Sequence, residues 1–204
     1  MWIEQPPFLY RLFFPEAIWR IPGKAKRVFL TFDDGPIPEV TPWVLNLLDH
    51  YQIKATFFCV GDNVRKYPAI YQDILSRGHQ VGNHTMHHIQ APGHSLKSYM
   101  RDIAEASTYI SSSLFRPPHG WMKYAQLRLV KRAYQIIMWD VVTRDYSKKR
   151  NSDQVFDTVK RYTRNGSILV FHDSLKAEKN LRGALARSLE WLLSEGYVFE
   201  TIHP

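Results

Sequence analysis

The sequence predicts an α/β fold with a mostly parallel sheet, and three observations support this prediction. Short runs of β-branched and aromatic residues alternate with longer helical patterns, which is typical of βα units. The chain has 204 residues, 45% of them hydrophobic, which is enough to build one sizeable core. No internal repeat and no linker rich in Gly or Ser divides the chain, so we expect a single domain.

About seven runs are typical of strands, close to the eight of a β/α barrel, and a shorter chain could close such a barrel imperfectly. The first, Val28–Phe32, is β-branched and aromatic and ends in a turn at 33–38. The others are expected at 55–60, 80–82, 114–116, 135–140, 167–171 and 197–201.

Helical patterns lie between these strands. Thr41 as N-cap, with Pro42 in the first turn, begins a helix whose apolar face continues to about residue 51. Gly78, Gly166 and Gly196 end three of the later helices. Those later helices are expected at 69–76, 95–113, 125–132, 152–163 and 181–194.

Residues 1–27 are expected to form an N-terminal extension that packs on a barrel domain of residues 28–204. Arg11 interrupts its aromatic run, so the segment lacks the unbroken apolar stretch of a secretory signal. The aromatic side chains are expected to cover the core. Peripheral membrane contact is the alternative, through Trp2, Trp19, Arg11 and Arg20.

No stretch approaches the roughly 18 apolar residues of a membrane-spanning helix. The absence of an export signal predicts a cytoplasmic protein, or a periplasmic or extracellular one if a signal was trimmed. Lys and Arg number 27 against 19 Asp and Glu, a formal net charge of +8, which favours anionic partners or simply keeps a protein soluble. The basic residues are dispersed without a recognition motif, so we expect no nucleic-acid partner. The single Cys59 excludes an internal disulfide framework, and no pattern predicts an oligomeric state.

Reactive side chains lie just past the ends of the predicted strands. In a parallel barrel the carboxyl ends of the strands open onto one face, where catalytic groups gather. We therefore expect residues distant in sequence to meet at one mouth. They are Asp33 and Asp34 after the first strand, His84 and His88 after the third, Arg116 and His119 after the fourth, Asp145 after the fifth and His172 after the sixth.

Two motifs predict a metal site at that mouth. Asp33 and Asp34 are adjacent carboxylates whose repulsion a cation relieves, although one of them could simply begin an Asx-turn. His84 and His88 are four residues apart, which one helical turn presents on one side. His87 could replace His88, since residues three apart on a helix, such as His84 and His87, also lie on the same side. Two imidazoles and one carboxylate, with a position open for water, suit catalytic zinc or a similar ion.

The remaining motifs suggest supporting roles. Arg116 lies in a rigid Arg-Pro-Pro-His-Gly turn and is either a functional guanidinium or an ordinary loop residue. Trp121 could stack on a sugar ring or be a half-buried core residue. His172 ends a strongly apolar strand and is a plausible general acid. The negative charge of Asp145, if it lies close to His172, could raise the pKa of His172.

These residues together resemble a known family. Five segments occur in the order and spacing of the five motifs of the polysaccharide deacetylases, carbohydrate esterase family four: Thr31–Pro36, His84–His88, Arg116–Gly120, Trp139–Tyr146 and Leu169–Asp173. The resemblance spans about Val28 to Thr201. It implies a distorted (β/α)7 barrel, called the NodB homology domain, and a metal-dependent removal of acetyl groups from a carbohydrate.

The resemblance also implies a role for each matching residue. Asp34, His84 and His88 would bind one divalent ion, zinc or else cobalt or nickel. Asp33 would be the general base, oriented by Arg116, and His172 the general acid, supported by Asp145. Leu169 would line the acetyl-methyl pocket, and the backbone amide of His119 would help to hold the oxyanion.

Two residues depart from the family pattern. His119 replaces an aromatic residue, which should leave the backbone donor intact, and Tyr146 replaces a Trp, which affects the sugar-binding wall. The substrate is expected to be an N-acetylated, or O-acetylated, glycan such as a chitin-like oligosaccharide, a peptidoglycan fragment or another N-acetylhexosamine glycan. A hydrolase of another linear or cyclic amide and an inactive glycan-binding homologue are the alternatives.

Overall fold

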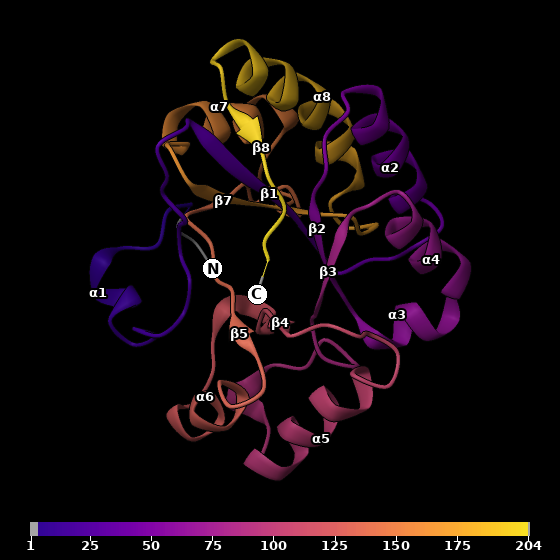
Figure 1. Cartoon of the computed structure of the whole chain (residues 1–204), viewed down its shortest axis with the longest axis vertical. Helices are drawn as coiled ribbons and strands as arrows, with labels where there is room; N and C mark the ends of the chain where they lie inside the picture. Colours follow the sequence, from indigo (N-terminus) through magenta and orange to yellow (C-terminus); the bar gives the residue numbers. More distant parts are fainter. Residues whose placement is uncertain (1–3, 204) are drawn as a thin grey trace.

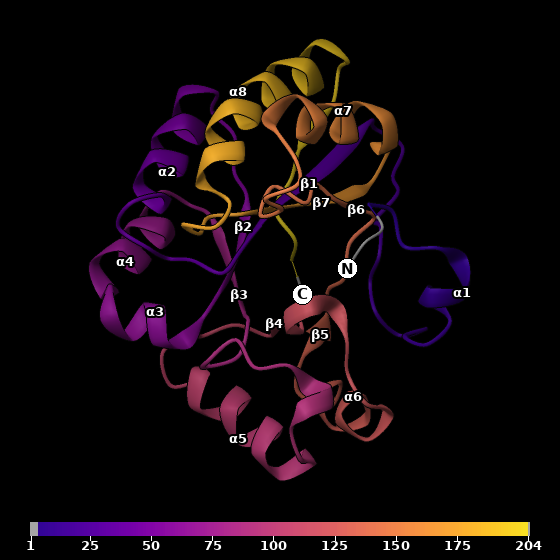
Figure 2. The same cartoon turned by 180° about the vertical axis from the view of Figure 1, so that it is seen from behind.

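The computed structural model describes residues 4–203, which form a curled sheet surrounded by helices (Figures 1 and 2). The sheet order is β5-β4-β3-β2-β1-β7-β6, with every pair parallel, and β8 pairs with β1 outside this path. The single domain is a distorted (β/α)7 barrel, as predicted. Its strands are β1 (Arg27–Asp33), β2 (Thr56–Cys59), β3 (Gln80–Asn83), β4 (Leu114–Phe115), β5 (Gln135–Ile136), β6 (Val141–Val142), β7 (Ser167–His172) and β8 (Val198–Phe199).

The longer helices cover the outside of the sheet (Figure 1). They are α2 (Thr41–His50), α3 (Gly61–Lys66), α4 (Pro68–Ser76), α5 (Leu96–Ala106), α6 (Tyr124–Val130), α7 (Ser152–Tyr162) and α8 (Glu178–Ser194), with α1 (Phe8–Arg11) at one side. α3 was not predicted, because six residues are too few to display an apolar period. α5 ends at Ala106 and not at residue 113. The Ser112 hydroxyl donates to Val81 O (2.7 Å) and accepts from Leu114 N (3.0 Å), which favours a non-helical backbone at residues 112–114.

The predicted strand at 135–140 is wrong in its extent. Only Gln135–Ile136 (β5) is a strand within that range, and a second short strand, β6 (Val141–Val142), follows after an irregular segment. The Arg116 guanidinium donates to the carbonyl oxygens of Ile137 (3.2 Å) and Met138 (3.1 Å). These two carbonyl groups therefore bind a side chain and not a neighbouring strand. Asp145 therefore follows β6 and not the strand that begins at Gln135.

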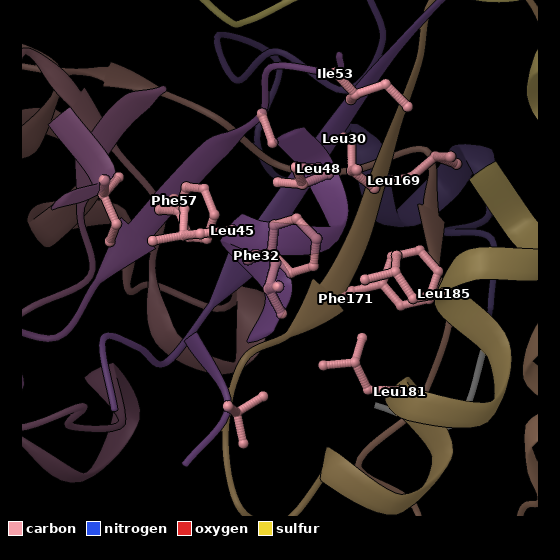
Figure 3. Packing of buried hydrophobic residues seen from close by; sticks show 14 of the residues in the cluster. Leu30, Phe32, Leu45, Leu48, Ile53, Phe57, Leu169, Phe171, Leu181 and Leu185 are labelled. Atoms are coloured by element: carbon pink, nitrogen blue, oxygen red, sulfur yellow. The ribbon is translucent and has the colours of Figure 1, made fainter. Parts of the chain in front are cut away.

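The core lies on both faces of the sheet. Along β1, Val28, Leu30 and Phe32 face the helices, where they pack with residues of α2 and α8 (Figure 3). Phe29 belongs to a second cluster inside the barrel. This alternation turns Thr31 and Asp33 inward as well, because successive side chains of a strand point to opposite faces. The rigid sheet thereby carries Asp33 to the mouth of the barrel.

Part of the N-terminal segment covers the core. Phe14 and Trp19 are buried in the inner cluster. The Arg11 guanidinium donates to Asp140 (2.8 Å), so Arg11 faces the protein. Trp2, one of the residues predicted for membrane contact, lies outside the described residues. Between residues 4 and 203, none of the helices has the length and apolar character needed to cross a bilayer.

Candidate active site

A cavity lies at the carboxyl ends of the parallel strands. Asp33 ends β1 and His172 ends β7, and these two residues are register partners in the sheet. The loops after β3, β4 and β6 supply the other walls. The cavity has a volume of about 270 Å³ and is lined by Asp33, Asp34, His84, His88, Pro117, His119, Trp139, Val142, Tyr146, Val170, His172 and Lys176. The predicted convergence of distant residues is therefore present.

Asp34, His84 and His88 form a cluster with the donor set of a divalent-metal site. One ligand atom from each lies within 4.8 Å of the other two. Asp34 Oδ1 is 3.2 Å from His88 Nε2 and 3.8 Å from His84 Nε2. Burial alone would raise the pKa of Asp34, but the His88 hydrogen bond and the three nearby imidazoles hold it well below its usual range. A carboxylate with two imidazole nitrogens fits catalytic zinc.

The His84 ring is prepared to act as a ligand. It is buried, and its Nδ1 lies 2.8 Å from the carbonyl oxygen of Arg116, to which Nδ1–H donates. This bond leaves the Nε2 lone pair free on the side of Asp34. Burial lowers the pKa of His84 to about 4, so the ring is neutral near pH 7.

The loop places His88, and not His87, beside Asp34. His88 contacts Asp34, whereas His87 Nδ1 lies 2.7 Å from Asp102 and its ring is half exposed. The loop is not the helical turn that the spacing suggested, because Thr85 and His88 have φ of 66° and 52°. Asp102 also accepts from the backbone N–H of His87 (3.1 Å), which fixes this conformation.

Asp33 is held by the buried guanidinium of Arg116. Arg116 Nη1 donates to Asp33 Oδ1 (2.6 Å) and to Thr31 Oγ1 (2.8 Å). The guanidinium carbon lies 4.0 Å from the centre of the Phe58 ring. Arg116 is fully buried, so removing Asp33 would leave a positive charge uncompensated. The pairing therefore fixes the orientation of the Asp33 carboxylate beside the cluster of Asp34, His84 and His88.

His172, at the end of β7, is paired with Asp145 from the loop after β6. Its Nδ1 lies 2.8 Å from Asp145 Oδ1, and its backbone N–H donates to Oδ2 (2.7 Å). Burial lowers the pKa of His172, but the Asp145 carboxylate outweighs it and the net result is a pKa of about 9. The imidazole is therefore protonated near pH 7. The Tyr146 ring packs edge-on against it, with centroids 4.8 Å apart.

The turn after β4 forms a third wall. His119 and Gly120 both have positive φ, 60° and 73°. A side chain at Gly120 would lie 2.3 Å from the Trp139 ring, which itself lines the cavity. The His119 ring is 4.9 Å from that of His88. The His119 side chain therefore lies beside the cluster of Asp34, His84 and His88.

Two residues suggested for the substrate pocket lie elsewhere. Leu169 packs among the helix-facing core residues, and its neighbour Val170 lines the cavity. The period of two along β7 accounts for this, because His172 and Val170 share one face and Leu169 is on the other. Trp121 is 37% exposed and stacks on Tyr10, outside the cavity lining.

Several supporting residues had no sequence signal of their own. Asn63, in the unpredicted α3, donates to the carbonyl oxygen of Asp34 (2.7 Å), where φ is 84°. Asp173 accepts from Gly35 N (3.1 Å) and Thr41 Oγ1 (2.6 Å), so it fixes the turn that carries both aspartates. Contacts of this kind depend on the fold and not on local spacing.

The comparison with known families gives the decisive finding. The sequence model described as "Polysaccharide deacetylase" matches residues 20–136, more than half of the chain. The chain belongs to this family. It is 34% identical over 192 residues to a peptidoglycan-N-acetylglucosamine deacetylase of Bacillus cereus, covering 90% of each. It is 29% identical over 196 residues to a chitooligosaccharide deacetylase of Sinorhizobium fredii, covering 87% of this chain and 91% of that protein.

The fold agrees with a solved member of the polysaccharide deacetylase family. The crystal structure of the Bc1960 peptidoglycan N-acetylglucosamine deacetylase, in complex with 4-naphthalen-1-yl-N-oxidanyl-benzamide, superposes with a TM-score of 0.88 and 29% identity. The match covers 97% of this chain and 95% of that one. Family membership and these relatives support a hydrolase that acts on a carbohydrate, in the class of the deacetylases.

Proposed function

We propose that the protein is a metal-dependent deacetylase that hydrolyses N-acetyl groups, or O-acetyl groups, of a carbohydrate. The substrate is a chitin-like oligosaccharide, a peptidoglycan fragment or another N-acetylhexosamine glycan. One arrangement carries the proposal: the Asp34, His84 and His88 cluster lines the same cavity as the Arg116-bound Asp33 and the Asp145-bound His172.

The residues divide the work of amide hydrolysis among themselves. Asp34, His84 and His88 would hold the ion, zinc or else cobalt or nickel. A divalent ion, when bound, lowers the pKa of its water from 15.7 toward about 7 and polarises a carbonyl. Asp33 accepts the proton of the attacking water, since Arg116 keeps its carboxylate oriented. The amide of His119 donates to the oxygen that becomes negative.

His172 completes the reaction as the proton donor. The departing nitrogen needs a proton, and the Asp145-bound imidazolium can supply it. Val170 and Trp139 line the cavity and form an apolar wall suited to an acetyl methyl group. Tyr146 would shape the sugar-binding wall. Because each of these steps has a residue in place, an inactive glycan-binding homologue is the less favoured reading.

The test is a screen of acetylated glycans with detection of free acetate, on protein whose metal content is measured. N-acetylated chitin oligosaccharides and peptidoglycan fragments are expected to release acetate. A chelator should remove this activity, and added zinc, cobalt or nickel should restore it. Turnover of a cyclic imide without acetate release would instead identify a hydrolase of other amides. Glycan binding without turnover in all three metals would identify a binding protein.

We propose contact with an anionic lipid surface as a second property, for the N-terminal segment. Four of its apolar side chains are largely exposed: Phe8 73%, Leu9 72%, Leu12 55% and Phe13 63%. The net charge of +8 adds an attraction for anionic lipids. Of the residues first suggested for this contact, Trp19 is buried, Arg11 binds Asp140 and Arg20 donates to Asn165 O (3.4 Å), so the exposed set takes their place.

Sedimentation with vesicles tests the lipid contact. The protein is expected to sediment with phosphatidylglycerol vesicles and much less with phosphatidylcholine vesicles. Replacing Phe8, Leu9, Leu12 and Phe13 by Ser should abolish sedimentation, whereas a control with Leu175 and Val198, 63% and 55% exposed, changed to Ser should retain it. Equal sedimentation of the two variants would contradict the proposal.

A further inference from the structure

The N-terminal strap, residues 4–19, touches two of the loops that wall the cavity. The Tyr10 hydroxyl donates to the carbonyl oxygen of Gly120 (2.5 Å), in the loop after β4. The carbonyl oxygen of Glu4 accepts from Val142 N (2.8 Å), in β6. The family match begins at residue 20, so these contacts come from a part of the chain that the family model does not cover.

The Tyr10 side chain is held firmly at this position. Its ring stacks on Trp121, with centroids 5.9 Å apart, and packs edge-on against Phe14 (5.9 Å) and Trp19 (5.7 Å). Burial raises the pKa of its phenol to about 12, so the hydroxyl remains a donor throughout the working pH range. Three aromatic neighbours and one short hydrogen bond leave the ring little freedom to rotate away.

The turn that Tyr10 contacts has an unfavourable backbone. His119 is a non-glycine residue with φ of 60°, a left-handed conformation in which the Cβ of an L-residue crowds the following carbonyl oxygen. Such a conformation persists only where the surroundings determine it. Gly120 N donates to Pro117 O (3.0 Å) within the turn, and the Gly120 carbonyl takes the bond from Tyr10.

We propose that the N-terminal strap is a positioning element of the active site, in which the Tyr10 hydroxyl holds the Pro118–Gly120 turn and thereby keeps the His119 amide in place for the substrate oxygen. The inference rests on the proposed deacetylase function. Tyr10 does not line the cavity, so it acts through the turn and touches no reacting atom. Small displacements of an oxyanion donor lower the rate strongly, because the charge it stabilises develops only in the transition state.

The test is Tyr10→Phe, which removes the hydroxyl and keeps the ring. We expect kcat to fall about 10- to 100-fold with KM within about twofold and metal content unchanged. Amide hydrogen exchange of Gly120, whose N–H donates to Pro117 O, should speed up, while that of residues 84–88 stays as in the unaltered protein. The matched control is Tyr124→Phe, at a tyrosine that is 73% exposed, and it should change neither quantity.

The outcomes separate the inference from the function on which it rests. Absence of acetate release by the unaltered protein overturns the proposed function. An active protein whose Tyr10→Phe variant keeps its kcat, or keeps its slow amide exchange at Gly120, overturns the positioning role. A fall in kcat equal to that of Tyr124→Phe would also overturn it.

Discussion

Replacing Asp34 by Ala is expected to remove both the bound metal and the deacetylase activity. Asp34 is the only carboxylate of the cluster, and without it two imidazoles and no negative charge remain to hold a dication. The same loss is expected of His84→Ala, since the Arg116 carbonyl orients this ring so that its Nε2 faces Asp34. Metal content after dialysis and acetate release are the two measurements, with circular dichroism to verify folding.

Two further variants sharpen this prediction. Asp33→Asn should bind the ion normally and still lose most of the rate, because it removes the base and leaves the three ligands. His50→Ala, at an exposed histidine of α2, should change neither metal content nor rate. Normal metal content in the Asp34 or His84 variant would show that the cluster is not the binding site. Full activity of Asp33→Asn would remove this residue as the base.

Replacing His172 by Ala should lower kcat by roughly 10²–10⁴, the usual contribution of general acid catalysis. The imidazolium supplies the proton that the departing nitrogen needs, and no other lining residue is paired in this way with a buried carboxylate among residues 4–203. A variant with a nearly normal rate would assign proton donation to another group.

The pH dependence follows from the same pair. Asp145 raises the pKa of His172 to about 9, so the acid form is populated below that pH and is lost as the pH rises through it. A bound dication would lower this value by charge repulsion. We therefore expect kcat to fall on the alkaline side, and Asp145→Asn to move this fall to lower pH. An alkaline limit that does not move in Asp145→Asn would contradict the assignment of the limit to His172.

The sequence predicted those features that depend on local pattern. The order of strands and helices follows from alternating periodicities, and the strand-end rule brought Asp33, His84 and His172 to one cavity. The sequence could not decide between His87 and His88, because the loop that carries them is irregular. Asp102, from α5, binds His87. The alternation along β7 could have shown that Val170, and not Leu169, shares the face of His172.

Other features depend on contacts between distant segments. The break between β5 and β6 occurs because Arg116, which follows β4, donates hydrogen bonds to the carbonyl oxygens of Ile137 and Met138. Nothing in the N-terminal sequence indicates that the Tyr10 hydroxyl reaches Gly120, 110 residues away. Such interactions are created by the fold. The cytoplasmic location, by contrast, stays a prediction.

The central claim is that one divalent ion binds to Asp34, His84 and His88 beside Asp33. Anomalous diffraction at the zinc absorption edge, from crystals of the protein grown with zinc, tests it most directly. The account predicts a single strong anomalous peak within coordination distance, about 2.0–2.2 Å, of the Asp34 carboxylate and of Nε2 of both histidines. A peak on other residues, with these three left unliganded, would contradict it.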